Sequence, residues 1–347
     1  MSHETLAIIW FILWGVIWAV YFMLDAYGLG TGILFPFVAK NDTEQKQLQE
    51  TIGPFWGGNE VWLILAGGAT FAAFPLTYAL MFSFLYTPLM IILFALFFRA
   101  AGLEFMHKHD TERWKKAWKW AFFGGSLIVP LFFGVAFANL FDGLLIRQTG
   151  KLDYVYEGSL FSLLTSYGLL GGLLFVSLFI VSGATWIGVK NEGKVVDRSI
   201  KIGNIAWVIS LILLLIFYVA TNNKTPLLDK FADYPILYVL PLLSVVFLAL
   251  VKPFLNKRKF GAAFGMVTAT IGTFMATGFV GMFPNMLPSK IDASFGVSLT
   301  DAAGSELNLK IMFIVAIIFV PIVLIYQFAM YRVFRKKITP DNATGYE

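Results

Sequence analysis

Long runs of apolar residues constrain this chain more than any other feature of its sequence. A helix that crosses the hydrocarbon core of a bilayer needs about 20 mostly apolar residues, and the sequence contains nine stretches of that kind. Hydrophobic residues make up 58% of the 347 residues and charged residues only 14%, whereas soluble domains carry roughly 25% charged residues. We therefore expect an all-α, polytopic membrane protein with nine transmembrane helices.

The nine predicted spans belong to a single integral membrane domain that covers residues 1–347, because no linker or low-complexity stretch divides the chain. The second and third spans are separated by Pro75 and are together too long for one helix, so we predict a turn there. The approximate spans are Leu6–Gly32, Pro54–Phe74, Leu76–Phe98, Trp118–Phe141, Leu160–Val189, Ile200–Ala220, Pro235–Val251, Phe260–Phe283 and Ile311–Tyr331. Helices 1–4 thus cover about residues 6–141, helices 5–8 about 160–283, and helix 9 about 311–331.

The distribution of Lys and Arg predicts the orientation of the chain. Basic residues gather after the third, fifth, seventh and ninth spans, around residues 99–119, 190–201, 252–259 and 332–337, and are fewer in the alternate connections. Basic connections lie in the cytoplasm, so we expect the N-terminus outside and the C-terminus in the cytoplasm. The net charge of +5 follows from these connections, and we expect no nucleic-acid partner.

Several kinds of chemistry are disfavoured by the residue inventory. The chain has no Cys, which excludes disulfides, thiolate-bound zinc and iron–sulfur clusters. Its three histidines, His3, His107 and His109, all lie outside the predicted spans, whereas a haem buried between helices usually needs an axial His inside one. We therefore expect no haem and no metal bound by this chain alone, and no catalytic residue in it.

Carboxylates near the cytoplasmic side are the candidate functional groups. Asp25 lies in the inner half of the first span, Glu60 about two turns into the second, and Glu104 at the end of the third. An acidic residue inside a span costs roughly 2.5–3.5 kcal/mol on insertion scales and is usually functional. Carboxylates on three consecutive helices suit proton entry. The alternative is structural: Asp25 or Glu60 pairs with Arg99, and Glu104 is a solvated charge at a helix end.

An aromatic face lies on the first span. Trp10, Trp14 and Trp18 recur every four residues, and Asp25 follows on nearly the same side of the helix. This face could meet a partner chain, and packing within the chain explains it equally well.

One segment carries a specific family resemblance. The block from Trp56 to Pro75, which reads Trp-Gly-Gly-Asn-Glu-Val-Trp-Leu-Ile-Leu-Ala-Gly-Gly-Ala-Thr-Phe-Ala-Ala-Phe-Pro, resembles subunit II of cytochrome bd-type quinol oxidases. Weaker matches flank it over nearly the whole chain, among them Gly102-Leu-Glu104, Gly134-Val-Ala-Phe-Ala-Asn139 and Val320-Pro-Ile-Val-Leu-Ile-Tyr326.

The resemblance implies a function and a fold. It implies a non-haem subunit of a terminal oxidase that oxidises membrane quinol and reduces oxygen to water in a bacterial or archaeal cytoplasmic membrane. The implied fold is two four-helix bundles plus one peripheral helix. Two b-type haems and one d-type haem would lie in a haem-bearing subunit I, the partner in a heterodimer. In some members a small single-helix subunit joins, or a quinone is held in a structural role.

The resemblance also implies a proton path that includes Asp25, Trp62 and Glu104. One position departs from the family pattern: the motif often reads Trp-Asp-Gly-Asn, and Gly57 stands here in the place of Asp. Glu60 lies three residues on, on the same helical face. Glu60 supplies the missing carboxylate, or the path differs or is absent.

Two other functions compete with a proton-conducting oxidase subunit. A proton-coupled secondary transporter would also have many spans and buried acids, but we identify no pair of discontinuous helices in matching halves, as transporters often show. A purely structural scaffold for the haem subunit would have the same span pattern and no protonic role.

Overall fold

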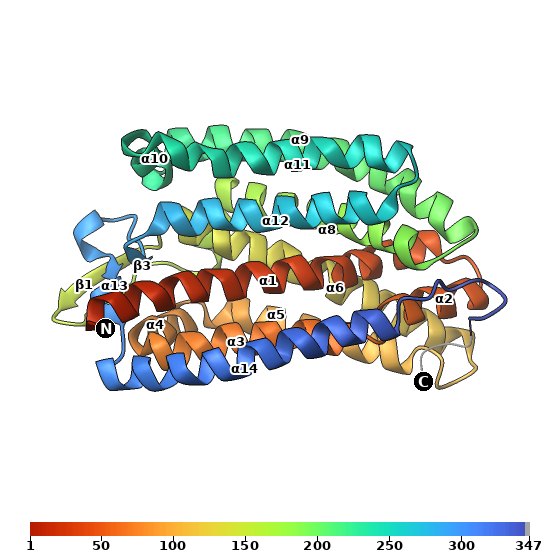
Figure 1. Cartoon of the computed structure of the whole chain (residues 1–347), viewed down its shortest axis with the longest axis horizontal. Helices are drawn as coiled ribbons and strands as arrows, with labels where there is room; N and C mark the ends of the chain where they lie inside the picture. Colours follow the sequence, from red (N-terminus) through yellow and green to blue (C-terminus); the bar gives the residue numbers. More distant parts are fainter. Residues whose placement is uncertain (344–347) are drawn as a thin grey trace.

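The computed structural model describes residues 1–343, which form long helices that run side by side (Figure 1). In chain order the helices are α1 (His3–Val38), α2 (Asp42–Ile52), α3 (Trp56–Ala73), α4 (Pro75–Phe84), α5 (Tyr86–Phe105), α6 (Glu112–Asp142), α7 (Leu160–Leu163), α8 (Ser166–Lys190), α9 (Lys194–Lys224), α10 (Asp229–Asp233), α11 (Val239–Asn256), α12 (Phe260–Met282), α13 (Leu299–Ala302) and α14 (Glu306–Val333). Short 3₁₀ turns lie at η1 (Pro226–Leu228), η2 (Pro235–Tyr238) and η3 (Ala293–Phe295). Two small antiparallel ladders pair β1 (Ile146–Gly150) with β2 (Asp153–Tyr156) and β3 (Asn285–Leu287) with β4 (Val297–Ser298).

The predicted class is confirmed, whereas the count of nine spans is not. Among the described residues, eight helices are long and apolar enough to cross a membrane. The predicted second span forms α3, an 18-residue helix that is not among these eight because Asn59 and Glu60 reduce its hydropathy. The predicted third span is divided into α4 and α5, which meet at Leu85. The turn predicted at Pro75 is present, since α3 ends at Ala73 and Pro75 begins α4.

The long helices are stacked in layers (Figure 1). Helices α9 and α11 lie side by side on one face, α8 and α12 form the next layer, and α1 with α6 follows. Helices α3 and α5 lie beyond them, and α14 crosses the outside of this group, in contact with α1 and α3. Helix α1 begins at one end of the stack, and α14 ends at the other (Figure 1).

Helix α1 is the central element of the fold. It packs against α3, α6, α8 and α12, and its tryptophan face lies inside the chain. Trp14 is fully buried and donates a hydrogen bond from Nε1 to Thr70 of α3 at 2.8 Å, while Trp10 donates to the carbonyl of Leu309 at 3.0 Å. Of the two alternatives for this face, contact with a partner chain or packing within the chain, the second therefore accounts for it.

Glycine permits a backbone contact between α1 and α8. A Cβ atom added to Gly30 would lie 1.8 Å from the carbonyl oxygen of Phe179, and one added to Gly183 would lie 2.3 Å from the carbonyl carbon of Gly30. Small residues of this kind let transmembrane helices approach closely, which compensates for the weak hydrophobic drive between helices in lipid.

This contact predicts the effect of one added methyl group. We expect Gly30→Ala to destabilise the protein by about 1–3 kcal/mol, because the clash is with backbone that cannot move aside. The matched control is Gly67→Ala in α3, where a new Cβ meets no atom within 4 Å and helix propensity alone favours Ala. Melting temperatures of the detergent-purified variants test this, and equal values for the two would show that the helices are not in contact here.

Candidate functional site

A buried cluster of three charged side chains joins the first three long elements of the chain. Arg99 of α5 lies between Glu60 of α3 and Asp25 of α1. Its Nη1 atom is 2.6 Å from Glu60 Oε1, and its Nη2 atom is 3.4 Å from Asp25 Oδ1. The side chains of Arg99 and Asp25 are fully buried, whereas that of Glu60 is 19% exposed. The cluster thus extends from a partly accessible carboxylate to a fully enclosed one.

The local sequence makes room for the guanidinium group. A Cβ atom at Gly28, one turn along α1 from Asp25, would lie 2.9 Å from Arg99 Nη2, so a larger residue there would displace the arginine. On another side the guanidinium carbon lies 5.5 Å from the ring centroid of Trp56, a distance at which an aromatic face attracts a cation. Arginine suits this position because its planar group reaches both carboxylates at once.

The cluster keeps hydrogen-bonding capacity that the described residues do not use. Asp25 Oδ2, Arg99 Nε and the hydroxyl of Tyr21, one turn before Asp25 on α1, are all buried and make no hydrogen bond of good geometry in residues 1–343. The Tyr21 hydroxyl lies close enough to the Asp25 carboxylate to interact with it. Buried polar groups are nearly always paired, so each exception calls for an explanation such as an internal water or a functional role. Three such atoms in one cluster indicate that this region is built for more than packing.

A second polar network lies beside the first and joins α14 to the rest of the chain. The indole Nε1 of Trp62 donates to Gln327 Oε1 at 2.8 Å, and Gln327 Nε2 donates to Asn59 Oδ1 at 3.3 Å. Asn59 Nδ2 donates to the hydroxyl of Tyr27 at 2.8 Å, and that hydroxyl lies 2.7 Å from the hydroxyl of Tyr331. We call these five residues the α14 clamp.

The structure brings together two of the four residues predicted for a proton path. Asp25 and Glu60 meet through Arg99, which the sequence indicated as a candidate ion-pair partner. Trp62 belongs instead to the α14 clamp and is 4% exposed. Glu104 is half-buried near the end of α5, with no ion pair among residues 1–343. Sequence reasoning missed the clamp residues Asn59, Gln327, Tyr27 and Tyr331, although an amide inside a hydrophobic span was a usable signal for the first two.

The described residues contain no cluster of side chains that could hold a metal ion. No group of three His, Cys, Asp or Glu gathers anywhere in residues 1–343. His3 lies at the first residue of α1 and contacts the carbonyl of Gly304 at 2.8 Å, and His107 and His109 lie in the connection after α5. This donor set does not suit an axial haem ligand between helices.

Taken together, the fold and this site define a polytopic all-α membrane protein with ionisable groups enclosed between its helices. A family model described as cytochrome bd terminal oxidase subunit II matches residues 6–334. The chain belongs to this family and is therefore a subunit of a terminal oxidase, an oxidoreductase complex that also contains an oxidase subunit I. It is accordingly a multi-pass bacterial membrane protein.

Individual relatives extend over almost the whole chain. Cytochrome bd-I ubiquinol oxidase subunit 2 of Escherichia coli K12 is 33% identical, with 99% of this chain and 97% of the relative aligned. Cytochrome bd ubiquinol oxidase subunit 2 of Bacillus subtilis is also 33% identical, over 97% and 98% of the two chains. A chain of the bd oxidase structure from Geobacillus thermodenitrificans has a TM-score of 0.77 at 16% identity, over 95% and 98% of the two chains, and so shares the fold. These similarities favour the oxidase over the transporter hypothesis.

Removal of the central cation tests the cluster. We expect Arg99→Gln to lower stability by about 3–5 kcal/mol, because it leaves two carboxylates buried without a counter-charge. Arg258→Gln is the control, since the Arg258–Asp197 pair is 72% and 61% exposed and such pairs contribute at most about 1 kcal/mol. The measurements are the yield and melting temperature of the purified complex.

Neutralisation of both acids in the same background completes this experiment. The triple variant Arg99→Gln, Asp25→Asn, Glu60→Gln removes every charge of the cluster and should recover part of the lost stability. Full stability of Arg99→Gln alone would contradict the ion-pair interpretation.

Proposed function

We propose that Glu60 and Asp25 relay protons from the cytoplasm toward the oxygen-reducing site of the partner subunit, in a complex that oxidises membrane quinol and reduces oxygen to water. The observation that carries this proposal is the gradient of exposure across the cluster. Glu60 is 19% exposed and Asp25 is fully enclosed, so protons have an accessible acceptor at one end and a buried acceptor at the other.

The unpartnered atoms support a relay rather than a static brace. A carboxylate whose oxygens are all engaged has little freedom to accept a proton, whereas Asp25 keeps Oδ2 free and has the hydroxyl of Tyr21 one turn away. Carboxylates can exchange protons directly or through one intervening water at hydrogen-bond distance. Arg99 then acts as a positioning residue, because it holds both acids in reach and supplies a fixed positive charge.

We propose more peripheral parts for Trp62 and Glu104. Glu104 is five residues beyond Arg99 on α5, toward the end that carries the basic connection, which suits a first acceptor for protons from solution. Trp62 holds α14 against α3 through its hydrogen bond to Gln327. In this position α14 covers the side of α3 that lies next to Glu60.

We further propose the composition of the complete assembly. The haem-bearing subunit I forms a heterodimer with this chain and contains two b-type haems and one d-type haem, consistent with a donor set here that suits none of them. A small single-helix subunit can join, as can a structural quinone and membrane lipid. An apolar cleft of about 330 Å³ between α3 and α5, with Trp18 and Phe133 in its lining, has room for a quinone tail.

The relay predicts a defect in turnover without a defect in assembly. We expect Glu60→Gln to slow oxygen reduction by about tenfold or more, the lower range for loss of a proton-transferring group. Glutamine keeps the size and most hydrogen bonds of Glu60, and Asp25 still compensates Arg99, so haem content should stay normal. Oxygen consumption and the optical spectrum of the purified complex measure the two properties. Glu306→Gln, at the exposed start of α14, is the matched control.

A rescue experiment separates the relay from a structural scaffold. A Cβ atom at Gly57 meets no atom within 4 Å, so Gly57→Asp fits the fold and restores an acid one turn from position 60. In the Glu60→Gln background it should recover part of the rate. If Glu60→Gln and Asp25→Asn each assemble and turn over at the parental rate, the acids are structural and protons enter through the partner subunit.

We also propose that residues 1–347 form one integral membrane domain with its N-terminus outside and its C-terminus in the cytoplasm. Reporter fusions near Lys116, Lys194 and Arg258 test this orientation, and we expect a cytoplasmic signal from all three because each follows an odd-numbered predicted span. A periplasmic signal at any of them would remove at least one of the predicted spans and move the carboxylates relative to the membrane.

A further inference from the structure

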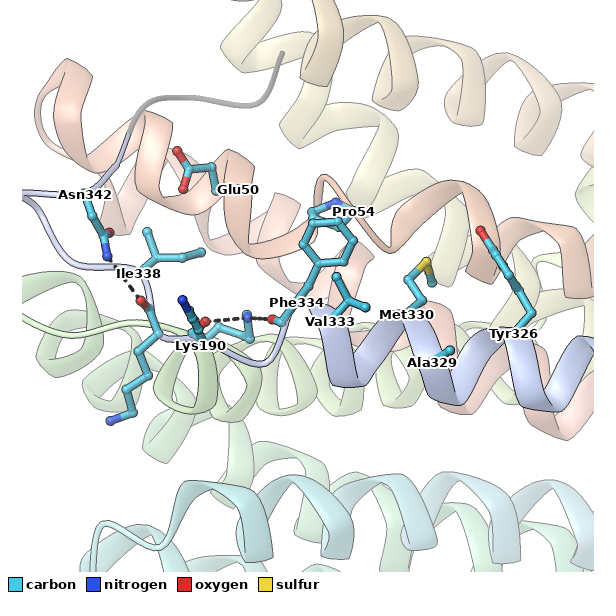
Figure 2. A pocket seen from close by; sticks show the side chains of 12 residues that line it. Glu50, Pro54, Lys190, Tyr326, Ala329, Met330, Val333, Phe334, Ile338 and Asn342 are labelled. Carbon is cyan, nitrogen blue, oxygen red and sulfur yellow. Dashed lines mark hydrogen bonds between the residues drawn. The ribbon is translucent and has the colours of Figure 1, made fainter.

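A large pocket opens at the end of the bundle where α14 terminates, away from the Asp25–Arg99–Glu60 cluster. It has a volume of about 840 Å³, within the range of ligand-binding cavities. The last turns of α14 form one wall, the end of α2 and the start of the α2–α3 connection form another, and the end of α8 closes the base (Figure 2). We call it the α14 pocket.

One part of the α14 pocket is apolar and lies along the transmembrane helix. Ala329, Met330 and Val333 of α14 line this part, together with Pro54 and Phe334 (Figure 2). Val333, the last residue of α14, and Phe334, which follows it, are 70% and 46% exposed, as is most of the apolar surface of this helix. An acyl chain that lies along α14 would cover them.

The other part of the pocket carries basic side chains. Lys336 and Lys337 line its rim, and Lys190, which is only 4% exposed, lies at its base. Lys190 donates hydrogen bonds to the backbone carbonyls of Phe334 and Lys336 (Figure 2) and has no carboxylate within ion-pair distance in residues 1–343. Lys337 lies 3.3 Å from Glu192, and Glu50 is an acidic residue in the same lining.

We propose that the α14 pocket binds one anionic phospholipid, with its phosphate at Lys336 and Lys337 above the buried charge of Lys190 and an acyl chain along α14. The order of the lining matches such a molecule, because the apolar part follows the helix into the bilayer and the basic part lies just beyond the helix end. The three lysines outnumber the two acids beside them, Glu50 in the lining and Glu192 next to Lys337, and so leave a net positive charge for the phosphate.

The lipid would also stabilise the attachment of α14. Within the described residues this helix packs mainly on α1 and α3. The segment that follows it is held by Lys190 of α8, which donates to the carbonyl groups of Phe334 and Lys336. A phosphate next to Lys190 would balance a positive charge that is otherwise compensated by carbonyl dipoles, since uncompensated buried charges are costly.

Lipid analysis of the intact oxidase complex tests this proposal. The complex is purified through a tag on this chain, and retained phospholipids are identified by native mass spectrometry before and after titration with phosphatidylglycerol or phosphatidylcholine. The charge variant is Lys336→Gln with Lys337→Gln, which leaves the backbone bond to Lys190 in place. The steric variant is Ala329→Trp, which fills the apolar part. The control is Lys257→Gln with Lys259→Gln, an equal loss of charge at an exposed turn outside the pocket.

We expect retention of the lipid to depend on the charge of its headgroup and on the free space along α14. The parent and the control should retain one phosphatidylglycerol that phosphatidylcholine does not displace. The charge variant should bind it about 25-fold more weakly, at roughly fivefold for each near-surface lysine, and Ala329→Trp should lose it. Equal retention in all four proteins, equal binding of the two lipids, or a parent complex in which the partner subunit fills the pocket would each overturn the proposal.

Discussion

The ion pairs of Arg99 with Asp25 and Glu60 are the interaction on which the arrangement of α1, α3 and α5 depends. Each of the three helices contributes one charge that would be costly alone inside a membrane, and the guanidinium group compensates both acids. Asp25 Oδ2 has no hydrogen-bond partner of good geometry in residues 1–343. Under the proposed relay, the residues that hold these helices together are also the ones that carry protons.

The outer helix α14 is held by different means. It has little buried surface, and the α14 clamp joins its middle to α1 and α3 through Gln327 and Tyr331, while Lys190 engages its end. Hydrogen bonds between membrane helices contribute modestly, about 0.6 kcal/mol on average, so a helix held by a few of them benefits from any molecule that covers its exposed side. The proposed lipid has this role at the α14 pocket.

Much of this organisation could be predicted from the sequence, with specific limits. The apolar runs predicted the long helices, and the isolated acids at positions 25 and 60 identified the cluster. The break at Leu85 was missed. Pro88 in the first turn of α5 was a usable local signal, because proline has no backbone N–H with which to continue the preceding helix. Helix α3 is less hydropathic than the neighbouring spans because it contains two polar residues, Asn59 and Glu60. Asn59 belongs to the α14 clamp, and Glu60 belongs to the cluster around Arg99. The hydrogen bond of Trp62 to Gln327 was not predicted, because it is formed across 265 positions of sequence and local patterns carry no information on such pairs.

The sequence by itself determined that this chain enters a membrane as helices, because the transfer energy of each segment is a sum over its own residues. It also determined the family, through a motif contained in one segment. Tertiary structure decided which charges meet: Arg99 lies between Asp25 and Glu60, and Gly28 leaves room for its guanidinium group. It also decided that the end of α14 stands apart from α2 and leaves a pocket. Such features depend on the positions of several helices at once, and those positions follow from the packing of the whole molecule.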